Sequence, residues 1–313
     1  LIHSINPPIG VHNSLNLVLV GHVKTRGGGG APFKKAPMEE KRRVISDTST
    51  PIEKFTLQHY MEEQGGQPLQ SFSVPNFPID YRDLDHLPVG QRLSHFVANW
   101  AVISDNAYLL HTLTHGYKIE FTENPPLQIN PAPFHLRLDA EQQAILDTEM
   151  ENFLTKDVIE PVLDLSTPGF YSSLFLRPKT DGGFRVIINL KPLNFYIKYR
   201  RFRMETSASV RQGLTQGDFA FMVDCKDAYC HLKIHPSSRK YLRFFWQGRC
   251  FQFKALCFGL SSAPYIFSLV VSHMARWFHM HAIMSHYYLD DWQYFDHVGS
   301  ILQLNQPHIF QFI

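Results

Sequence analysis

Hydrophobic and polar positions change their spacing along the chain near Ser166. Before that point, apolar residues recur at helical spacing in two segments, LSHFVANWAVI from Leu93 and LDAEQQAILDTEMENFLTKDVIEPV from Leu138. Asp139 in the second segment is a typical helix-capping residue. We therefore predict a helix in each segment, with the proline-rich stretch at 124–134 as an extended connector between them.

After Ser166 the spacing becomes that of strands. Two aromatic and β-branched runs, 170–179 and 183–190, flank the turn sequence TDGG and predict a β-hairpin. A strand in DFAFMVDCKDAY, a hairpin in YLRFFWQGRCFQFKAL, a long helix in LSSAPYIFSLVVSHMARWF and a last hairpin in SHYYLDDWQYF follow in order. This succession predicts an α+β fold.

Residues 1–85 show neither spacing. They include RGGGGAPFKKAPMEEKRR, a glycine-rich and charge-rich stretch typical of a flexible linker, and we predict that this region is disordered. The chain of 313 residues is long enough for a large core, and 44% of its residues are hydrophobic. We find no secretory signal and no apolar run long enough to cross a membrane, and the four cysteines fit no zinc spacing. These features favour an intracellular protein of the cytoplasm or nucleus with reduced thiols.

Charge is nearly balanced overall but not locally. The net charge is only +2, yet the stretch from Arg177 to Arg203 holds eight basic residues and one acid. Aromatic residues alternate with these cations, and this mixture is typical of surfaces that bind phosphates and stack on bases. A solvated basic face is the ordinary alternative.

Two adjacent aspartates, Asp290 and Asp291, interrupt an aromatic run at the turn of the last hairpin. Asp-Asp is common in tight turns, and a hairpin needs no other explanation. A functional interpretation requires a third carboxylate nearby, with a cation to offset the repulsion. Asp224 ends another predicted strand, and neighbouring strands lie only about 5 Å apart.

Four segments in this order resemble the fingers and palm of reverse transcriptases: RPKTDGGFRVIINLKPLN, MVDCKDAYCHLKI, LCFGLSSAPYIF and YLDD. The resemblance covers about Leu138 to Phe295. METSASVRQGL, FWQGR, FGLSSAP and YLDDW are most similar to the DIRS-type (tyrosine-recombinase) retrotransposons, with gypsy-like elements next. The implied fold is a polymerase palm, an antiparallel sheet backed by helices, with fingers.

The resemblance also implies a domain plan. Residues 86–135 form a helical and proline-rich connector, and 136–313 the reverse transcriptase region. Within that region the fingers span about 136–215 and 230–257, and the palm about 216–229 and 258–313. After Phe295 the expected palm strands, thumb and ribonuclease H do not follow, so we expect a C-terminally truncated domain whose palm sheet lacks a strand.

By resemblance the activity is RNA-directed DNA polymerisation: a dNTP joins a primer 3′-hydroxyl on an RNA or DNA template, with two Mg²⁺ ions for which Mn²⁺ can substitute. Asp224 and Asp290 are expected to bind metal directly, Asp291 to support them, and the carbonyl of Cys225 to contribute. An inactive remnant that at most binds nucleic acid is the alternative. An RNA-copying RNA polymerase is disfavoured, because Tyr229 would obstruct ribonucleotides.

Further positions carry over from the family one at a time. Lys179 and Arg185 match basic residues that clamp the triphosphate, although surface charge is their ordinary explanation. Asp227 and Ala228 match positions whose backbone amides meet the phosphates. Tyr229 matches the bulky gate beneath the sugar, with a plain core role as its alternative. Phe258 stands where retroviral enzymes carry glutamine. The expected nucleotide-binding residues are Lys179, Arg185, Asp227, Ala228, Tyr229 and Phe258, and the expected nucleic-acid-binding residues are Gly259 and Pro264.

Overall fold

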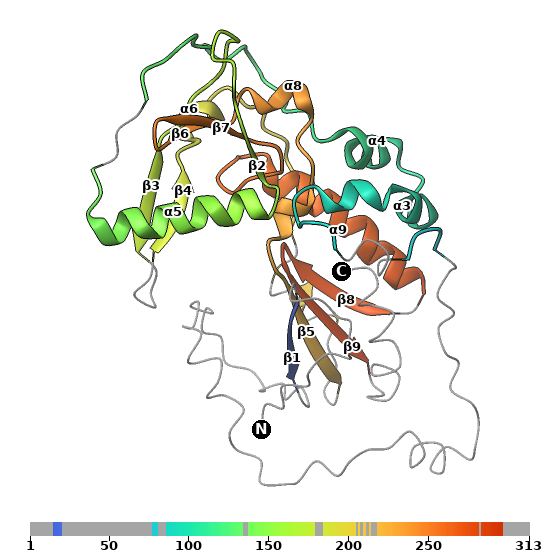
Figure 1. Ribbon diagram of the computed structural model, residues 1–313. Helices are drawn as coiled ribbons and strands as arrows, with labels where there is room; N and C mark the ends of the chain where they lie inside the picture. The colour runs from blue at the N-terminus through green and yellow to red at the C-terminus, as the bar shows by residue number, and fades with distance from the viewer. Residues whose placement is uncertain are drawn as a thin grey trace, which may run out of the picture. The chain divides into compact units, whose positions relative to one another are not determined.

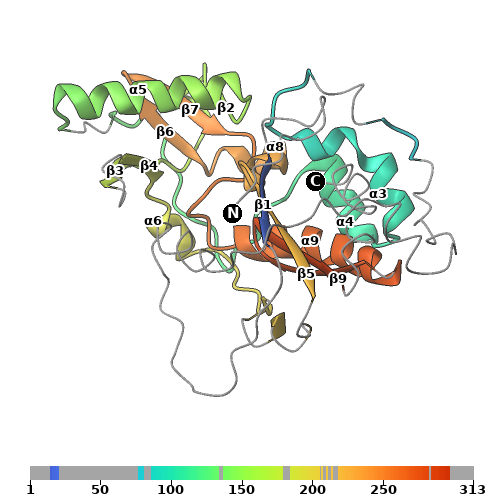
Figure 2. The same cartoon turned by 90° about the horizontal axis from the view of Figure 1, so that it is seen from below.

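The computed structural model describes residues 15–20, 77–80, 86–133, 137–178, 184–204, 206, 209–210, 213, 218–281 and 283–296. The chain divides into two compact units. The first unit comprises Leu1–Val74, Glu205–Cys225 and Phe278–Ile313, and the second comprises Pro75–Met204 and Lys226–Trp277. Figure 1 and Figure 2 show the helices and strands of both units.

A four-stranded antiparallel sheet forms the first unit, in the order β1-β5-β9-β8. Its strands are β1 (Leu15–Val20), β5 (Phe219–Cys225), β8 (Met284–Tyr288) and β9 (Asp291–Asp296), and Figure 1 shows them side by side. A two-residue turn joins β8 to β9, as the sequence predicts. Leu289 in this turn has φ 56°, a left-handed conformation that is unfavourable for a residue with a side chain.

Aromatic packing fixes how β9 sits in this sheet. Trp292 and Tyr294 alternate along the strand, so they share one face, and both are fully buried. The ring of Phe278 packs edge-on against both, with ring centroids 6.1 and 5.7 Å apart. A slip of one residue would move both rings to the opposite face, so this packing selects one register.

Strand β1 lies within residues 1–85, the region that we predicted to be disordered. Leu15–Val20 pairs with β5 along its whole length, from Leu15 opposite Cys225 to Val20 opposite Ala220. The LNLVLV segment is rich in aliphatic and β-branched residues, and without it the edge of β5 would leave backbone groups unpaired. Strand β1 therefore forms one edge of the four-stranded sheet. The rest of the predicted disordered region, apart from 77–80, lies outside the described residues.

The second unit combines two smaller antiparallel sheets with helices. One sheet has the order β2-β7-β6 and the other is the β3–β4 hairpin, whose predicted TDGG turn lies outside the described residues. The strands are β2 (Ile159–Pro161), β3 (Leu174–Pro178), β4 (Phe184–Ile188), β6 (Arg243–Trp246) and β7 (Arg249–Phe253). The helical segments are η2 (Arg92–His95), α3 (Val97–Ile103), α4 (Ala107–His115), α5 (Ala140–Thr155), α6 (Lys191–Asn194), η3 (Ala228–His231), α8 (Pro236–Arg239) and α9 (Ala263–Met280), which continues into the first unit at Phe278.

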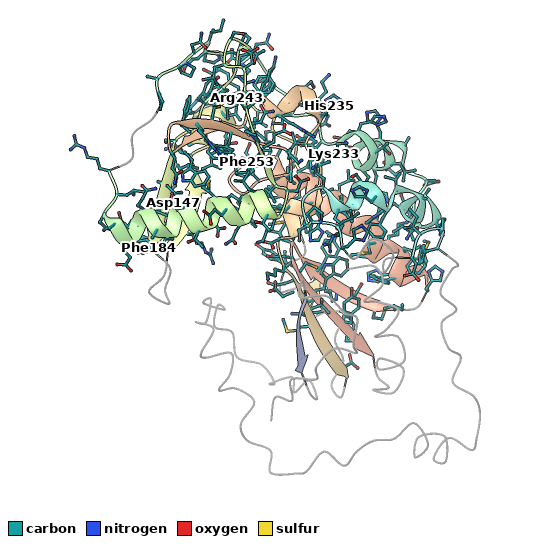
Figure 3. All side chains as sticks on the ribbon, viewed as in Figure 1. Asp147, Phe184, Lys233, His235, Arg243 and Phe253 are labelled. Atoms are coloured by element: carbon teal, nitrogen blue, oxygen red, sulfur yellow. The ribbon has the colours of Figure 1, made fainter. Side chains whose placement is uncertain are left out.

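Helix α5 begins as predicted. Asp139 caps it by accepting from the backbone of Gln142, whose side chain accepts from Asp139 in return. Trp246 of β6 donates from Nε1 to Asp147 at 2.6 Å, and this hydrogen bond holds α5 against the β6–β7 hairpin. Figure 3 labels Asp147 on α5 and Phe253 on β7.

The segment from Leu93 differs from the single helix that we predicted. It divides into η2 and α3, and the unpredicted α4 follows, capped by Asn106, which accepts from the backbone of Leu109 at 2.9 Å. Helix α9 buries Ile266, Val270 and Met274, as its apolar spacing predicts. Among the described residues, every helix is too short or too polar to span a bilayer.

Candidate active site

Three aspartates lie at one end of the sheet in the first unit. Asp224, near the end of β5, stands directly opposite Asp291, the first residue of β9, and Asp290 precedes it in the turn. The backbone N–H of Cys225 donates to the carbonyl oxygen of Asp290 at 2.9 Å. Because β5 and β9 are neighbours in the sheet, direct strand pairing brings the three predicted carboxylates to one place.

The aspartates repel one another in the absence of a cation. Residues directly opposite on antiparallel strands have Cβ atoms about 4.5–5.5 Å apart, and like charges there are destabilising. Partial burial, followed by the charge of Asp224, raises the pKa of Asp290 above its ordinary value. Burial and the charges of the three aspartates also raise the pKa of the Cys225 thiol. The local field is therefore strongly negative and suited to a cation.

The chemistry of these groups fits a hard divalent cation, because carboxylate oxygens are the ligands that Mg²⁺ prefers. Yet within the described part of the chain, no three His, Cys, Asp or Glu side chains already stand close enough to hold a metal ion. The backbone thus gathers Asp224, Asp290 and Asp291, while their side chains have not converged on one point.

Two of the predicted nucleotide-binding residues touch each other in the second unit. The rings of Tyr229 and Phe258 have centroids 4.8 Å apart, and Tyr229 also packs edge-on against Phe267 at 5.3 Å. Tyr229 is only 7% exposed, whereas Phe258 is 59% exposed. The burial agrees with a core role for Tyr229, and the contact places an accessible ring directly beside it.

A turn before η3 holds Asp227 in a left-handed conformation, with φ 57°. Its carboxylate forms an ion pair with Lys156, the residue that follows α5, with Nζ–O distances of 2.8 and 3.0 Å. The ion pair uses the side chain of Asp227, so a role in phosphate binding would fall to its backbone and to the neighbouring Ala228. Our sequence reasoning missed Lys156, because nothing in LTKD links it to a turn 71 residues away.

A second side chain that the sequence did not single out is Asn194, at the end of α6. It donates from Nδ2 to the carbonyl of Gly259 at 2.8 Å and accepts at Oδ1 from the backbone of Ser261 at 2.9 Å. Gly259 has φ 93°, which favours glycine, and an added Cβ would lie 3.4 Å from the carbonyl oxygen of Ile188. Asn194 therefore fixes the loop that carries Phe258. Its position in the KPLN segment, which contributes to the family resemblance, was the available signal.

Arg185 lies on β4 directly opposite Arg177 on β3, and both side chains are exposed. Facing like charges are unfavourable in a hairpin unless an anion lies between them. The other predicted phosphate clamp, Lys179, lies outside the described residues. Pro264 occupies the first turn of α9 and is half-buried.

Residues 177–312 match the family model described as reverse transcriptase (RNA-dependent DNA polymerase). This part of the chain is a reverse transcriptase domain. The matched range contains all three aspartates and every predicted site residue. The family predicted from the sequence is thus confirmed for this range, while the assignment to DIRS-type or gypsy-like elements stays a prediction.

Similar sequences occur within larger viral polyproteins. The genome polyprotein of Petunia vein clearing virus (isolate Shepherd) is 28% identical over 141 residues, which are 44% of this chain and 6% of the polyprotein. The putative enzymatic polyprotein of Cassava vein mosaic virus is 26% identical over 146 residues, 45% of this chain and 22% of the polyprotein. The chain therefore spans a small part of the curated relatives that it matches.

Among solved structures, the protease–reverse transcriptase of prototype foamy virus aligns with 18% identity and a TM-score of 0.48. The alignment covers 62% of this chain and 26% of the foamy virus chain.

Proposed function

We propose that the chain carries the fingers and palm of an RNA-directed DNA polymerase from a retroelement. It would extend a primer 3′-hydroxyl with dNTPs along an RNA or DNA template. One observation carries the proposal: within a reverse transcriptase domain, β5 and β9 pair so that Asp224 faces Asp291, with Asp290 bonded through its carbonyl to Cys225. A plain hairpin turn requires no third carboxylate on the adjacent strand.

Asp224 and Asp290 would hold two Mg²⁺ ions directly, with Asp291 and the carbonyl of Cys225 in support, and Mn²⁺ could replace Mg²⁺. Bound divalent cations supply activation of the attacking hydroxyl and stabilisation of the leaving pyrophosphate. The chain contributes rigid placement: the Cys225–Asp290 backbone bond fixes the turn, and the buried faces of Trp292 and Tyr294 fix the register. This placement keeps the carboxylates near one another before any ligand arrives.

Residues of the second unit would bind the substrates. Arg185 and Lys179 would neutralise the triphosphate, and the backbone at Asp227 and Ala228 would meet its oxygens. The Tyr229 ring would exclude a ribose 2′-hydroxyl, with Phe258 beside it at the nucleotide. Gly259 and Pro264 would adjoin the nucleic acid, and the left-handed φ of Gly259 supports a close backbone approach there.

Mn²⁺ binding and primer extension test this proposal together. We expect the full chain to bind Mn²⁺, as followed by electron paramagnetic resonance, and Asp290→Asn to weaken that binding at least tenfold. Primer extension with dNTPs should fall below detection in the same variant. Asp164→Asn is a matched control, because Asp164 is exposed and outside the sheet. Equal Mn²⁺ binding by the parent and Asp290→Asn would overturn the proposal.

A second candidate, a remnant that binds nucleic acid without catalysis, is favoured by the side chains that have not converged on one point. In that case oligonucleotides would bind to the chain, but Mn²⁺ would bind no better to the parent than to Asp290→Asn. The same two measurements therefore separate the candidates.

We also propose that the parent element is of the DIRS type. The segments METSASVRQGL, FWQGR, FGLSSAP and YLDDW support this proposal. The coding sequence around the gene tests it: a tyrosine recombinase in the same element would support the assignment, and an integrase would contradict it.

A further inference from the structure

A short part of the connector, the VGQR segment at 89–92, is bonded to the turn at 227–230 in the second unit. This turn carries the backbone that would meet the triphosphate. The backbone N–H of Gln91 donates to the carbonyl oxygen of Cys230, the last residue of the turn, at 2.8 Å. The match to the reverse transcriptase family begins only at residue 177, so the role of this segment has to be found in its contacts.

The same segment also lies against the residues that follow α5. The backbone N–H of Gly90 donates to the carbonyl oxygen of Lys156 at 2.7 Å. A Cβ atom added at Gly90 would lie only 2.2 Å from the carbonyl oxygen of Asp157, so this close approach requires glycine. Because the ammonium group of Lys156 pairs with Asp227, the connector reaches the turn a second time through this lysine.

Three residues with unfavourable backbone conformations meet at this contact. Among the described residues, six that are not glycine have a positive φ, and three of the six lie here: Gln91 at 63°, Asp157 at 59° and Asp227 at 57°. Left-handed conformations are unfavourable for residues with a side chain, and they persist only where the surrounding structure holds them. Such strain gathers at binding and catalytic sites. The turn therefore needs support from its neighbours to keep its conformation.

The side chain of Gln91 is held at both of its polar atoms. Its Oε1 accepts from Nη2 of Arg239 at 3.2 Å, and its Nε2 donates to the carboxylate of Asp157 at 3.4 Å. Nη1 of Arg239 is fixed in turn by both carboxylate oxygens of Glu160, at 3.0 and 3.1 Å. These bonds hold the backbone N–H of Gln91 where it meets the turn.

We propose that Gln91 is a positioning residue of the nucleotide site. Its side chain fixes the connector, and its backbone N–H holds the turn so that the amides of Asp227 and Ala228 face the triphosphate. The inference rests on the proposed function, from which the role of these amides is taken. Plain packing is the ordinary alternative, but it requires no left-handed residue in each of the three segments that meet here.

Hydrogen–deuterium exchange of the peptide over residues 226–232, with and without a dNTP and Mg²⁺, tests the proposal on the full chain. Gln91→Met keeps the length of the side chain and loses both of its hydrogen bonds. Without nucleotide, this peptide should exchange faster in Gln91→Met than in the parent. Half-maximal protection should need about three- to tenfold more dNTP in the variant, the equivalent of about one lost hydrogen bond.

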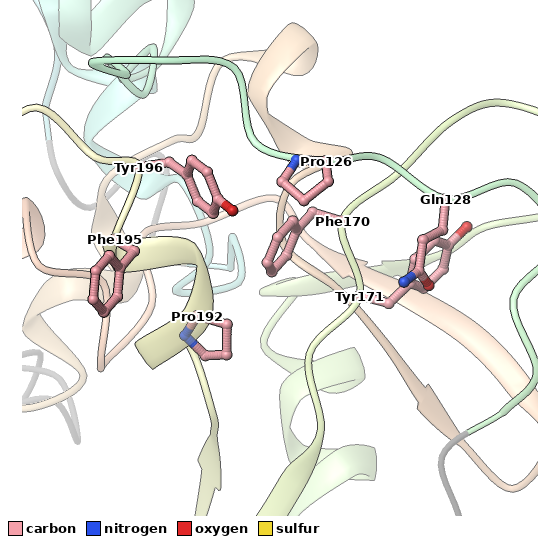
Figure 4. A pocket seen from close by; sticks show the side chains of 7 residues that line it. All are labelled: Pro126, Gln128, Phe170, Tyr171, Pro192, Phe195 and Tyr196. Atoms are coloured by element: carbon pink, nitrogen blue, oxygen red, sulfur yellow. The ribbon is translucent and has the colours of Figure 1, made fainter.

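Two controls show that the effect is local. Gln247→Met is the matched variant, because Gln247 is also left-handed, with φ 48°, but lies exposed in the turn between β6 and β7. It should match the parent in both measurements. The aromatic pocket of the same unit, which Figure 4 shows, contains none of the residues at the contact. Exchange around Phe170 in that pocket should therefore be equal in all three proteins.

Kinetics of primer extension separate positioning from general stability. In Gln91→Met the KM for dNTPs should rise by the same factor, while kcat and the affinity for primer–template stay those of the parent. General destabilisation would instead lower kcat at an unchanged KM. Equal exchange of the 226–232 peptide in Gln91→Met and the parent, or an equal dNTP concentration for its protection, would overturn the inference. Absence of extension by the parent would contradict the proposed function, whereas exchange requires no turnover and still decides the role of Gln91.

Discussion

Replacing Asp290 with asparagine is expected to stabilise the metal-free chain while it removes the proposed metal site. Asp290 is half-buried and lies in the turn beside the facing pair Asp224 and Asp291, and its burial and the charge of Asp224 raise the pKa of its carboxyl group. Asparagine has nearly the same shape and can accept the same backbone hydrogen bond, but it carries no charge. The substitution therefore removes repulsion and loses no bonding partner. The gain in EDTA tests this repulsion, and its reversal by Mg²⁺ tests the metal site.

The size of the gain follows from the strand pairing. Like charges that face each other on adjacent strands, as Asp224 and Asp291 do, change stability by roughly 0.2–1 kcal/mol, and Asp290 adjoins this pair. Solvent screens a half-exposed group, so we expect a value within that range and not above it. Metal binding to the parent would reverse the order, because a ligand that binds only the folded chain adds about 2.7 kcal/mol at a concentration 100 times its Kd.

The pH dependence has a definite sign. The folded chain holds the Asp290 proton more tightly than the unfolded chain, whose carboxyl titrates near 3.8. The stability of the parent therefore falls as pH rises from about 3.8 through the folded pKa. The advantage of Asp290→Asn should appear above this window and vanish below it, where the carboxyl is protonated in both states.

Hydrogen–deuterium exchange of the β8–β9 peptides measures this effect locally. In EDTA at neutral pH, we expect slower exchange in Asp290→Asn than in the parent, and in Mg²⁺ the opposite order. Asp164→Asn should match the parent in both buffers. Faster exchange of Asp290→Asn in EDTA, or equal protection of both proteins by Mg²⁺, would refute the reasoning and leave the hairpin turn as the explanation.

Three other substitutions test the second unit. Asn194→Ala should lower the free energy of unfolding by about 1–3 kcal/mol, because the two hydrogen bonds from Asn194 to the Gly259 loop are lost. An unchanged midpoint of urea unfolding would show that these hydrogen bonds do not hold the loop. Lys156→Met removes the ion pair with Asp227 but keeps an apolar side chain of similar length. The KM for dNTPs should rise, while the free energy of unfolding changes by less than about 1 kcal/mol. An unchanged KM would show that the ion pair has a purely structural role. Tyr229→Ala should allow the chain to incorporate ribonucleotides. Because the ring is buried, the substitution should also lower the free energy of unfolding by about 3–5 kcal/mol. Discrimination between ribonucleotides and deoxynucleotides equal to that of the parent would contradict the gate role of Tyr229.

Local signals in the sequence predicted the elements that depend on a few neighbouring residues. The capping pair of Asp139 and Gln142 marks the start of α5, and the alternating aromatics around Asp290 mark the last hairpin. Such features act within one turn or one strand, so the order of the residues alone reveals them. The three aspartates could be named for the same reason, because each lies at the end of a recognisable strand.

Partners remote in sequence were decided only by the tertiary structure. Three contacts join segments that lie dozens to hundreds of residues apart in the sequence. They are the pairing of β1 with β5, the ion pair of Lys156 with Asp227, and the hydrogen bond of Asn194 to Gly259. No local pattern specifies them, because each arises from an edge, charge or loop that becomes available only after packing. The register that sets Asp224 opposite Asp291 likewise depends on the burial of Trp292 and Tyr294, which a strand acquires only inside its sheet.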